Sequence, residues 1–174
     1  MSMDLVDLYD ENRIPLGKTA ERYAHKQRGE YRVVVHVCLF DKSGRLLIQQ
    51  RSMKKRMCPG KWDVSAAGAV DAGETPGRSA EREVLEELGY TLDLTGIRPS
   101  ITVNLSGGFD DFFIVQRDIE LSELRLQEEE VDAVRWSTQE EVLEMMDRGE
   151  FISYPKGFIP FLFAMRNQFG FIMS

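Results

Sequence analysis

Hydrophobic residues fall into short continuous or alternating runs along most of the chain, a pattern typical of β-strands. The run YRVVVHVCLF (31–40), the turn DKSG and the run RLLIQQRS (45–52) predict a β-hairpin. Further strands are expected at 62–68, 96–105, 109–120 and 131–137. Strands on both sides of a central helix predict an α/β (α+β) fold, with a mixed sheet and helices on its faces.

Three segments after residue 70 predict helices. In the first, Thr75 is the expected N-cap, Pro76 the first helical residue and Gly89 the left-handed residue after the end. The segment TQEEVLEMMDRG (138–149) is amphipathic, and the aromatic-rich tail 151–170 is expected to be helical after Pro155. The tail is expected to pack on the sheet, with a dimer surface as the alternative.

The N-terminal segment is expected to form an extension to the core. LVDLYDENRIPLG predicts two short strands around the turn at 10–12, and TAERYAHKQRGE (19–30) predicts a short helix. No linker or repeat interrupts the chain, so we expect a single domain over 1–174, with the extension at 1–30 and the core at 31–174.

Charge and cysteine content exclude several classes of function. A net charge of −7 and a pI near 5.0 disfavour nucleic acid and anionic membranes as partners, although a bridging cation would still allow phosphates to bind. Cys38 and Cys58 are too few for a disulfide framework, which favours a reduced, cytoplasmic protein. No apolar run approaches the roughly 20 residues that span a bilayer.

The helix expected at 76–88 carries clustered carboxylates. Helical spacing places Glu83, Glu86 and Glu87 on one face, and the opposite, apolar face comprises Ala80, Val84, Leu85 and Leu88. Like charges four residues apart destabilise a helix by a few tenths of a kcal/mol. A countercharge must therefore come from outside this face, and without it at least one of these carboxyl groups should have a raised pKa.

These glutamates belong to a longer pattern of fixed spacing that resembles the Nudix box of the Nudix hydrolases, here at residues 68–90. Its charged and glycine positions are all filled, by Gly68, Glu74, Arg82, Glu83, Glu86, Glu87 and Gly89. Tyr90 departs from the aliphatic residue usual in the family. The resemblance implies a Nudix-type α/β/α sandwich, here with an added N-terminal β-hairpin.

The resemblance also implies an activity. Nudix hydrolases cleave the pyrophosphate bond of a nucleoside diphosphate linked to another group, by means of Mg²⁺ or Mn²⁺. Carboxylate oxygens are the ligands these hard cations prefer. The implied ligands are the side chains of Glu83, Glu86 and Glu87 and the carbonyl of Gly68. Glu86 is the expected general base, with Glu83 as the alternative, and Glu74 and Arg82 are expected to form a structural ion pair.

The flanking sequence LLIQQRSMKKRMCPGKWDVSAAGAV resembles the isopentenyl-diphosphate isomerase branch of the same fold. Alignment on Trp62 places Ala67 where those enzymes have a catalytic cysteine and Ala69 where they have a metal-binding histidine. Because an alanine supplies neither a thiol nor a metal ligand, we do not expect isomerase activity. An isomerase-like enzyme and a non-catalytic nucleotide-binding module remain the alternatives to a hydrolase.

Residues outside the Nudix box are candidates for contacting a small-molecule diphosphate substrate, expected to be a nucleotide. The candidates are Arg51 and Lys61 from a basic loop that also holds Lys54, Lys55 and Arg56, together with Asp111. The resemblance to the isomerases, which have acidic metal ligands near this position, implies a metal or catalytic role as the alternative for Asp111. A solvated loop is the alternative for the basic residues. Glu128, Glu129 and Glu130 are expected to be solvated, although some Nudix enzymes have their base on a late loop, and His36 is expected in the core. Neither the group attached to the diphosphate nor the choice between monomer and homodimer follows from the sequence.

Overall fold

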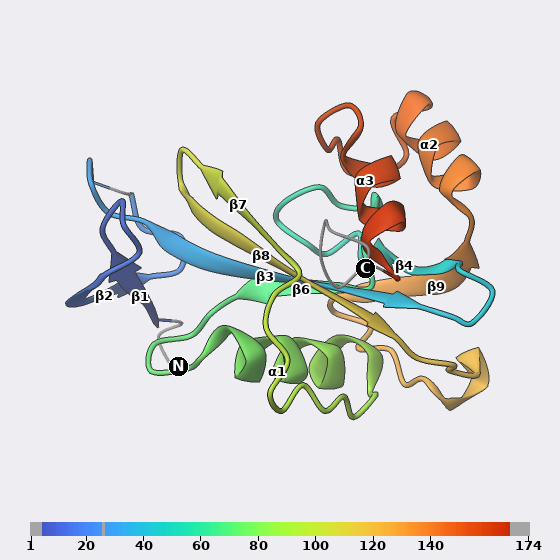
Figure 1. The fold of residues 1–174 in the computed structure, drawn as a ribbon, viewed down its shortest axis with the longest axis horizontal. Coiled ribbons are helices and arrows are strands. Elements are labelled where there is room, and N and C mark those ends of the chain that lie inside the picture. Colours follow the sequence, from blue (N-terminus) through green and yellow to red (C-terminus); the bar gives the residue numbers. More distant parts are fainter. Residues whose placement is uncertain (1–4, 26, 168–174) are drawn as a thin grey trace, which may run out of the picture.

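A seven-stranded mixed sheet forms the centre of the fold (Figure 1). The computed structural model describes residues 5–25 and 27–167. The strands of the sheet are β3 (Arg32–Phe40), β4 (Leu46–Arg51), β5 (Trp62–Asp63), β6 (Ala66–Ala69), β7 (Ile101–Leu105), β8 (Gly108–Gln116) and β9 (Val131–Ser137). They follow the order β5-β4-β3-β8-β7, with β6 paired to β3 and β9 paired to β4.

The β3–β4 connection is the predicted hairpin, but the two strands pair only at Phe40 and Leu46. Beyond that point β3 pairs with β6, whereas β4 pairs with β9 and β5. The side chain of Ser65 lies where they diverge: its Oγ accepts from the Leu39 N–H at 2.8 Å and donates to the Leu47 carbonyl at 2.6 Å. The single strand expected at 62–68 is therefore divided into β5 and β6 around this serine.

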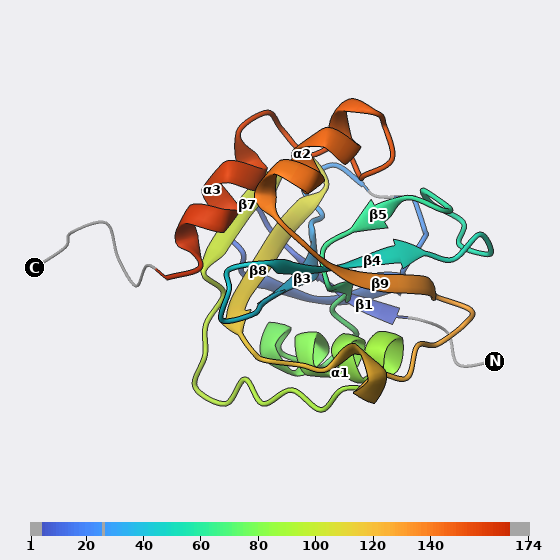
Figure 2. The same ribbon diagram turned by 90° about the vertical axis from the view of Figure 1, so that its right-hand side faces the viewer.

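Helices cover both faces of the sheet, as predicted. Helix α1 (Pro76–Leu88) lies on one face, and α2 (Gln139–Asp147) and α3 (Phe158–Met165) lie on the other (Figures 1 and 2). Each face has its own buried cluster: Val35, Leu39, Val84, Leu88 and Phe113 lie on the α1 side, and Phe40, Ile48, Phe112, Met145 and Leu162 on the other. The tail helix α3 thus packs on the sheet. Residues 168–170 of the predicted tail lie outside the described residues, and no described helix is long and apolar enough to cross a membrane.

The N-terminal extension is a separate two-stranded hairpin of β1 (Leu5–Tyr9) and β2 (Pro15–Glu21) at one end of the sheet (Figure 1). The prediction of a helix at 19–30 was wrong. Residues 19–21 complete β2, where Glu21 is opposite Leu5, and the chain then turns, with the Ala24 N–H bonded to the Glu21 carbonyl. Pairing with β1 satisfies these backbone groups and so overrides the weak helical pattern. An isolated bridge between Tyr9 and Tyr31 joins the hairpin to the segment that precedes β3.

Candidate active site

Local contacts fix both ends of α1 and so set where its glutamates lie along the sheet. The Thr75 hydroxyl accepts from the Arg78 N–H at 3.3 Å, Pro76 is the first residue, and Gly89 has a left-handed φ of 64°. This φ favours glycine because it lacks a Cβ. The helix then packs against β6 and β3.

The buried face of α1 is rotated toward the carboxylates relative to the sequence prediction. Glu83 and Glu87 are only 6% and 3% exposed, whereas Leu85, which we expected on the core side, is 52% exposed. Glu86 lies on the outer side of the cluster with its side chain 51% exposed. Two of the three glutamates therefore point under the helix toward the sheet, and one faces solvent.

Glu87 is held by polar groups of two strands. Its Oε2 accepts from Nε2 of Gln49 on β4 at 2.9 Å and from the Ala67 N–H on β6 at 3.2 Å. Glu83 lies against the next residue of β6, because a Cβ built on Gly68 would come within 2.0 Å of the Glu83 Oε1. The missing side chain of Gly68 thus provides the space that the Glu83 carboxylate occupies.

Within the described residues, Arg82 is the cation that contacts the glutamate cluster directly. Its Nη1 donates to the Glu83 Oε1 at 2.8 Å and to the Glu86 Oε2 at 3.2 Å. Its Nε donates to both oxygens of Glu74, so the predicted pair of Glu74 and Arg82 is brought together. Burial lowers the pKa of Arg82, but the bonds to Glu74 and Glu83 outweigh burial and raise it.

Burial perturbs the two inner carboxyl groups. Desolvation raises the pKa of Glu83, although the charge of Arg82 acts in the opposite direction. For Glu87, desolvation and then the charge of Glu83 raise the pKa to about 7, against the hydrogen bond from Gln49. The raised pKa values agree with our expectation in direction, but burial contributes more than the repulsion we invoked.

Of the basic loop between β4 and β5, Lys55 lies within electrostatic reach of Glu83 and Glu87. It is half-buried, and its Nζ is paired with the Oε2 of Glu130. The two residues selected from the sequence have other partners, and Arg51 pairs with Asp63 at 3.7 Å. Arg51 donates to the Met57 carbonyl at 3.1 Å, and Lys61 donates to the Gly149 carbonyl.

Asp111 lies on the opposite flank of α1 from this cluster, on β8. It is fully buried and forms a two-point ion pair with Arg13 of the N-terminal hairpin, one branch of which measures 2.9 Å. The Thr102 hydroxyl also donates to it at 2.6 Å. Its observed partners therefore belong to the hairpin and β7.

Ala67 and Ala69 lie on the sheet face that α2 and α3 cover. Ala67 is the register partner of His36 on β3, so the two side chains share that face. His36 Nε2 lies 3.2 Å from the Asp110 Oδ2, its ring stacks on Phe112, and its Nδ1 is buried without a partner among the described residues. His36 is therefore a polar residue beside Ala67, with one of its ring nitrogens unpaired among the described residues.

The comparisons with known proteins agree with this geometry. The model of the NUDIX domain family matches residues 30–156, more than half of the chain. The chain belongs to the Nudix family. An uncharacterised Nudix hydrolase of Listeria monocytogenes is 44% identical over 165 residues, covering 95% of this chain and 96% of its own. An isopentenyl-diphosphate Δ-isomerase of Streptomyces avermitilis is 31% identical over 157 residues, covering 86% and 79%.

Solved structures show the same fold. A Deinococcus radiodurans protein superposes with a TM-score of 0.74 at 23% identity, covering 92% of this chain and 98% of its own. The Nudix domain of Shewanella oneidensis NrtR, solved in complex with ADP-ribose, superposes with a TM-score of 0.53 at 18% identity, covering 72% and 82%. At these identities the likeness establishes the fold alone.

The donor set of this Nudix chain fits a hard divalent cation in its chemistry. Two buried carboxylates beside a glycine and a third at the solvent edge supply the oxygen ligands that Mg²⁺ and Mn²⁺ prefer. Among residues 5–25 and 27–167, no three His, Cys, Asp or Glu side chains converge as a formed metal centre. Arg82 donates to Glu83 and Glu86 together, so its guanidinium lies between these two carboxylates.

Two polar residues of the site were missed by sequence analysis. Gln49 is buried in β4 and fixes Glu87, and the pair Gln49-Gln50 inside the apolar run RLLIQQRS was the available signal. Arg22, from the N-terminal extension, bonds to Asp71 at 3.1 Å, and its charge is close enough to Glu83 to influence the pKa of that carboxyl. No local pattern marks Arg22, because only the tertiary fold brings it to the Nudix box.

Proposed function

We propose that this protein hydrolyses the pyrophosphate bond of a nucleoside diphosphate linked to another group, with Mg²⁺ or Mn²⁺ as cofactor. The proposed ligands are the side chains of Glu83, Glu86 and Glu87 and the carbonyl of Gly68. The observation that carries the proposal is the burial of Glu83 and Glu87 against β6, where both carboxyl groups have raised pKa values. A bound divalent cation would offset this desolvation and repulsion.

The residues of the site have distinct proposed roles. The cation, when bound, polarises the phosphoryl group and lowers the pKa of a bound water. Glu86, half-exposed at the edge of the cluster, accepts the proton of the attacking water while the bond between phosphorus and the bridging oxygen breaks. Gln49 holds Glu87 in place, and the pair of Glu74 and Arg82 holds the loop before α1 against the helix.

Substitution of Glu86 tests the proposal. Glu86→Gln keeps the size of the side chain and should lower kcat by about 10²–10⁴, the usual effect of losing a general base. The matched control is Glu144→Gln on α2, because Glu144 is an exposed helical glutamate that also pairs with an arginine four residues away. Metal titration by calorimetry on both variants gives a second readout, and Glu86→Gln alone should weaken Mg²⁺ binding.

The outcomes separate the alternatives. Undiminished turnover in excess EDTA would exclude the metal-dependent mechanism. Nucleotide binding without turnover in the wild-type protein would favour a non-catalytic module. A severe loss in Glu83→Gln with a mild loss in Glu86→Gln would leave the metal site standing and move the base to Glu83. The substrate panel should include ADP-ribose, because a structural neighbour binds it, alongside dinucleotides and nucleotide sugars.

The isomerase relatives favour a second candidate, rearrangement of isopentenyl diphosphate. The sheet face where that chemistry would need a thiol and an imidazole carries Ala67 and Ala69 instead. We expect no deuterium incorporation into isopentenyl diphosphate in D₂O, measured by mass spectrometry. If wild type did incorporate deuterium, and Glu86→Gln did so equally, the isomerase reaction would depend on residues other than Glu86.

A further inference from the structure

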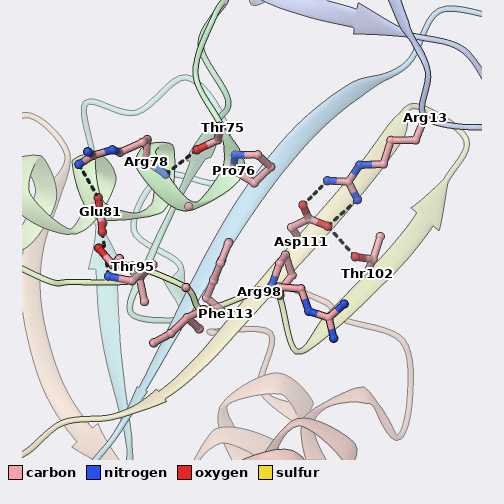
Figure 3. A pocket seen from close by; sticks show the side chains of 15 residues that line it. Arg13, Thr75, Pro76, Arg78, Glu81, Thr95, Arg98, Thr102, Asp111 and Phe113 are labelled. Atoms are coloured by element: carbon pink, nitrogen blue, oxygen red, sulfur yellow. Dashed lines mark hydrogen bonds and ion pairs between the residues drawn. The ribbon is translucent and has the colours of Figure 1, made fainter.

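A cavity of about 750 Å³ lies on the flank of α1 that faces away from the carboxylate cluster. It is open to solvent and is lined by the first turns of α1, the loop 94–99 and strands β7 and β8, and the turn of the N-terminal hairpin contributes Arg13 (Figure 3). Cavities of roughly 300–1,000 Å³ are typical of small-molecule sites. Its size therefore allows a ligand as large as a mononucleotide.

The cavity is separate from the proposed hydrolytic site. Glu87 bonds to β4 and β6, and Glu83 lies against β6. The cavity is instead lined from β7 and β8, which lie on the other side of β3 in the sheet. The body of α1 stands between the two, so one bound molecule would not contact both.

Charge in the cavity is positive in an otherwise acidic protein. Asp111 neutralises Arg13, and Glu81 pairs with Arg78 at 3.2 Å. Arg98, on the loop 94–99, forms no hydrogen bond or ion pair within the part of the chain that the structure describes. One guanidinium is therefore available, and the partial positive charge at the start of α1 lies on the same side.

Apolar side chains form the rest of the lining. Leu94 and Phe113 lie behind the lining in the α1-side core and are almost fully buried, whereas Ile97 is exposed and Pro76 and Pro99 are partly exposed. An apolar surface beside a single free guanidinium suits a ligand with an apolar body and one anionic group. Arginine binds both phosphate and carboxylate groups through paired N–H donors.

We propose that this cavity binds a small organic anion, in which a phosphate or carboxylate group contacts Arg98 and an apolar or aromatic body packs on Pro76, Ile97 and Pro99. The site lies beyond the proposed hydrolytic site and does not depend on the hydrolase activity. Phosphate and carboxylate ligands share this chemistry, and the choice between them is left to the measurement.

Phenyl phosphate, benzoate, inorganic phosphate and phenol are suitable probes, titrated into ¹⁵N-labelled protein in EDTA. Without a divalent cation the carboxylate cluster repels anions, so binding reports the cavity. We expect saturable shifts in the amide signals of residues 94–99 with phenyl phosphate or benzoate, and weaker effects with inorganic phosphate and phenol. The stronger of the two aromatic anions identifies the charged group.

Arg98→Gln should weaken that binding by roughly tenfold or more, because it removes a charge-assisted contact. The matched control is Arg148→Gln, an exposed arginine beside α2 that should leave the affinity unchanged. The proposal is overturned if no aromatic anion shifts residues 94–99 up to about 10 mM. It is also overturned if Arg98→Gln binds as tightly as wild type, or if inorganic phosphate binds as tightly as phenyl phosphate.

Discussion

Glu83, Glu86 and Glu87 share one helix, but their surroundings give them different chemistry. Glu87 is fixed by two donors and buried, so it is suited to hold a ligand rather than to move a proton through solvent. Glu86 is half-exposed and has only Arg82 as a partner in the described structure. The difference in exposure therefore favours Glu86 as the base, whereas helical spacing alone does not distinguish the three glutamates.

The positive charge of Lys55 should strengthen the binding of a diphosphate substrate and weaken the binding of Mg²⁺. Burial lowers the pKa of its ammonium, but the charges of Glu87 and Glu83 act to keep it protonated near the cluster. Lys55→Met should raise KM for a diphosphate substrate roughly tenfold and tighten Mg²⁺ binding, since one repelling charge is removed. Steady-state kinetics and calorimetric Mg²⁺ titration measure the two effects.

The control is Lys54→Met, because Lys54 is the exposed neighbour and pairs with Glu129 at 2.9 Å in a similar way. It should change neither quantity more than about twofold. Equal effects of the two substitutions would show that Lys55 acts only as a surface charge.

Glu87 should make metal-free stability depend on pH. Its folded-state pKa of about 7 is above the ordinary value of 4.5 for a glutamate, so between these values the folded protein binds a proton that the unfolded chain does not. The contribution of Glu87 to the free energy of unfolding therefore falls as pH rises from about 4.5 to about 7, and it remains lower at higher pH. In EDTA, Glu87→Gln should be more stable than wild type at about pH 8, by on the order of 2 kcal/mol, and similar at about pH 5.

Chemical denaturation at both pH values measures this difference. Mg²⁺ at about pH 8 should stabilise wild type and leave Glu87→Gln nearly unchanged, because only the wild-type site binds the ion tightly. If Glu87→Gln raised the free energy of unfolding equally at both pH values, the effect could not come from ionisation of Glu87.

At the scale of elements, α1 was predictable and its rotation was not. Local signals define its ends: the Thr75 cap, Pro76 and the left-handed Gly89 all lie where the sequence placed them. The buried stripe could not be placed from hydrophobicity, because Glu83 and Glu87 occupy positions that an average helix would fill with apolar residues. Strands β1 and β2 show the opposite case, where pairing with the preceding strand overrode a local helical pattern at residues 19–21.

Gly68 should be intolerant of a side chain for reasons specific to the site. Gly68→Ala places a Cβ about where the Glu83 carboxylate lies, so this carboxylate must move. We expect Mg²⁺ affinity and kcat to fall by at least about tenfold while the fold is retained. Gly77→Ala is the stability control: the added Cβ meets nothing within 4 Å, and alanine is the better helix former, so its thermal midpoint should stay equal or rise. Normal Mg²⁺ binding in Gly68→Ala would contradict the proposed role of Glu83 as a metal ligand beside β6.

At the scale of the whole molecule, the site is assembled from segments far apart in the chain. Gln49, Lys55 and Arg22 come from β4, the loop after it and the N-terminal extension, and all three lie close to α1. The Nudix box alone was recognisable, because its spacing is local. The contributions of the other segments depend on long-range pairings, such as β3 with β8 in parallel, which no local pattern encodes.

The N-terminal hairpin is joined to the sheet by the ion pair of Arg13 and Asp111. The turn at 10–14 presents Arg13 with a left-handed φ of 63°, and its guanidinium lies 5.4 Å from the centre of the Phe109 ring. Arg13→Met leaves the fully buried Asp111 carboxylate with the Thr102 hydroxyl as its one remaining side-chain partner among the described residues. Loss of one partner of a buried pair is strongly destabilising, so we expect a cost of roughly 2 kcal/mol, reduced because Arg13 is partly exposed.

A double-mutant cycle separates this structural role from a catalytic one. Asp111→Asn in the Arg13→Met background removes the unpaired charge and should recover part of the lost stability, measured by urea denaturation. Lys18→Met on the same hairpin is the control and should change stability by less than about 0.5 kcal/mol, since Lys18 is exposed and its contact with Glu30 measures 4.0 Å. The sequence suggested that Asp111 contacts the substrate. If it does, its substitution should lower activity rather than stability. If Asp111→Asn lowered kcat/KM at least tenfold with its free energy of unfolding unchanged, Asp111 would act on the substrate and the hairpin would be held by other contacts.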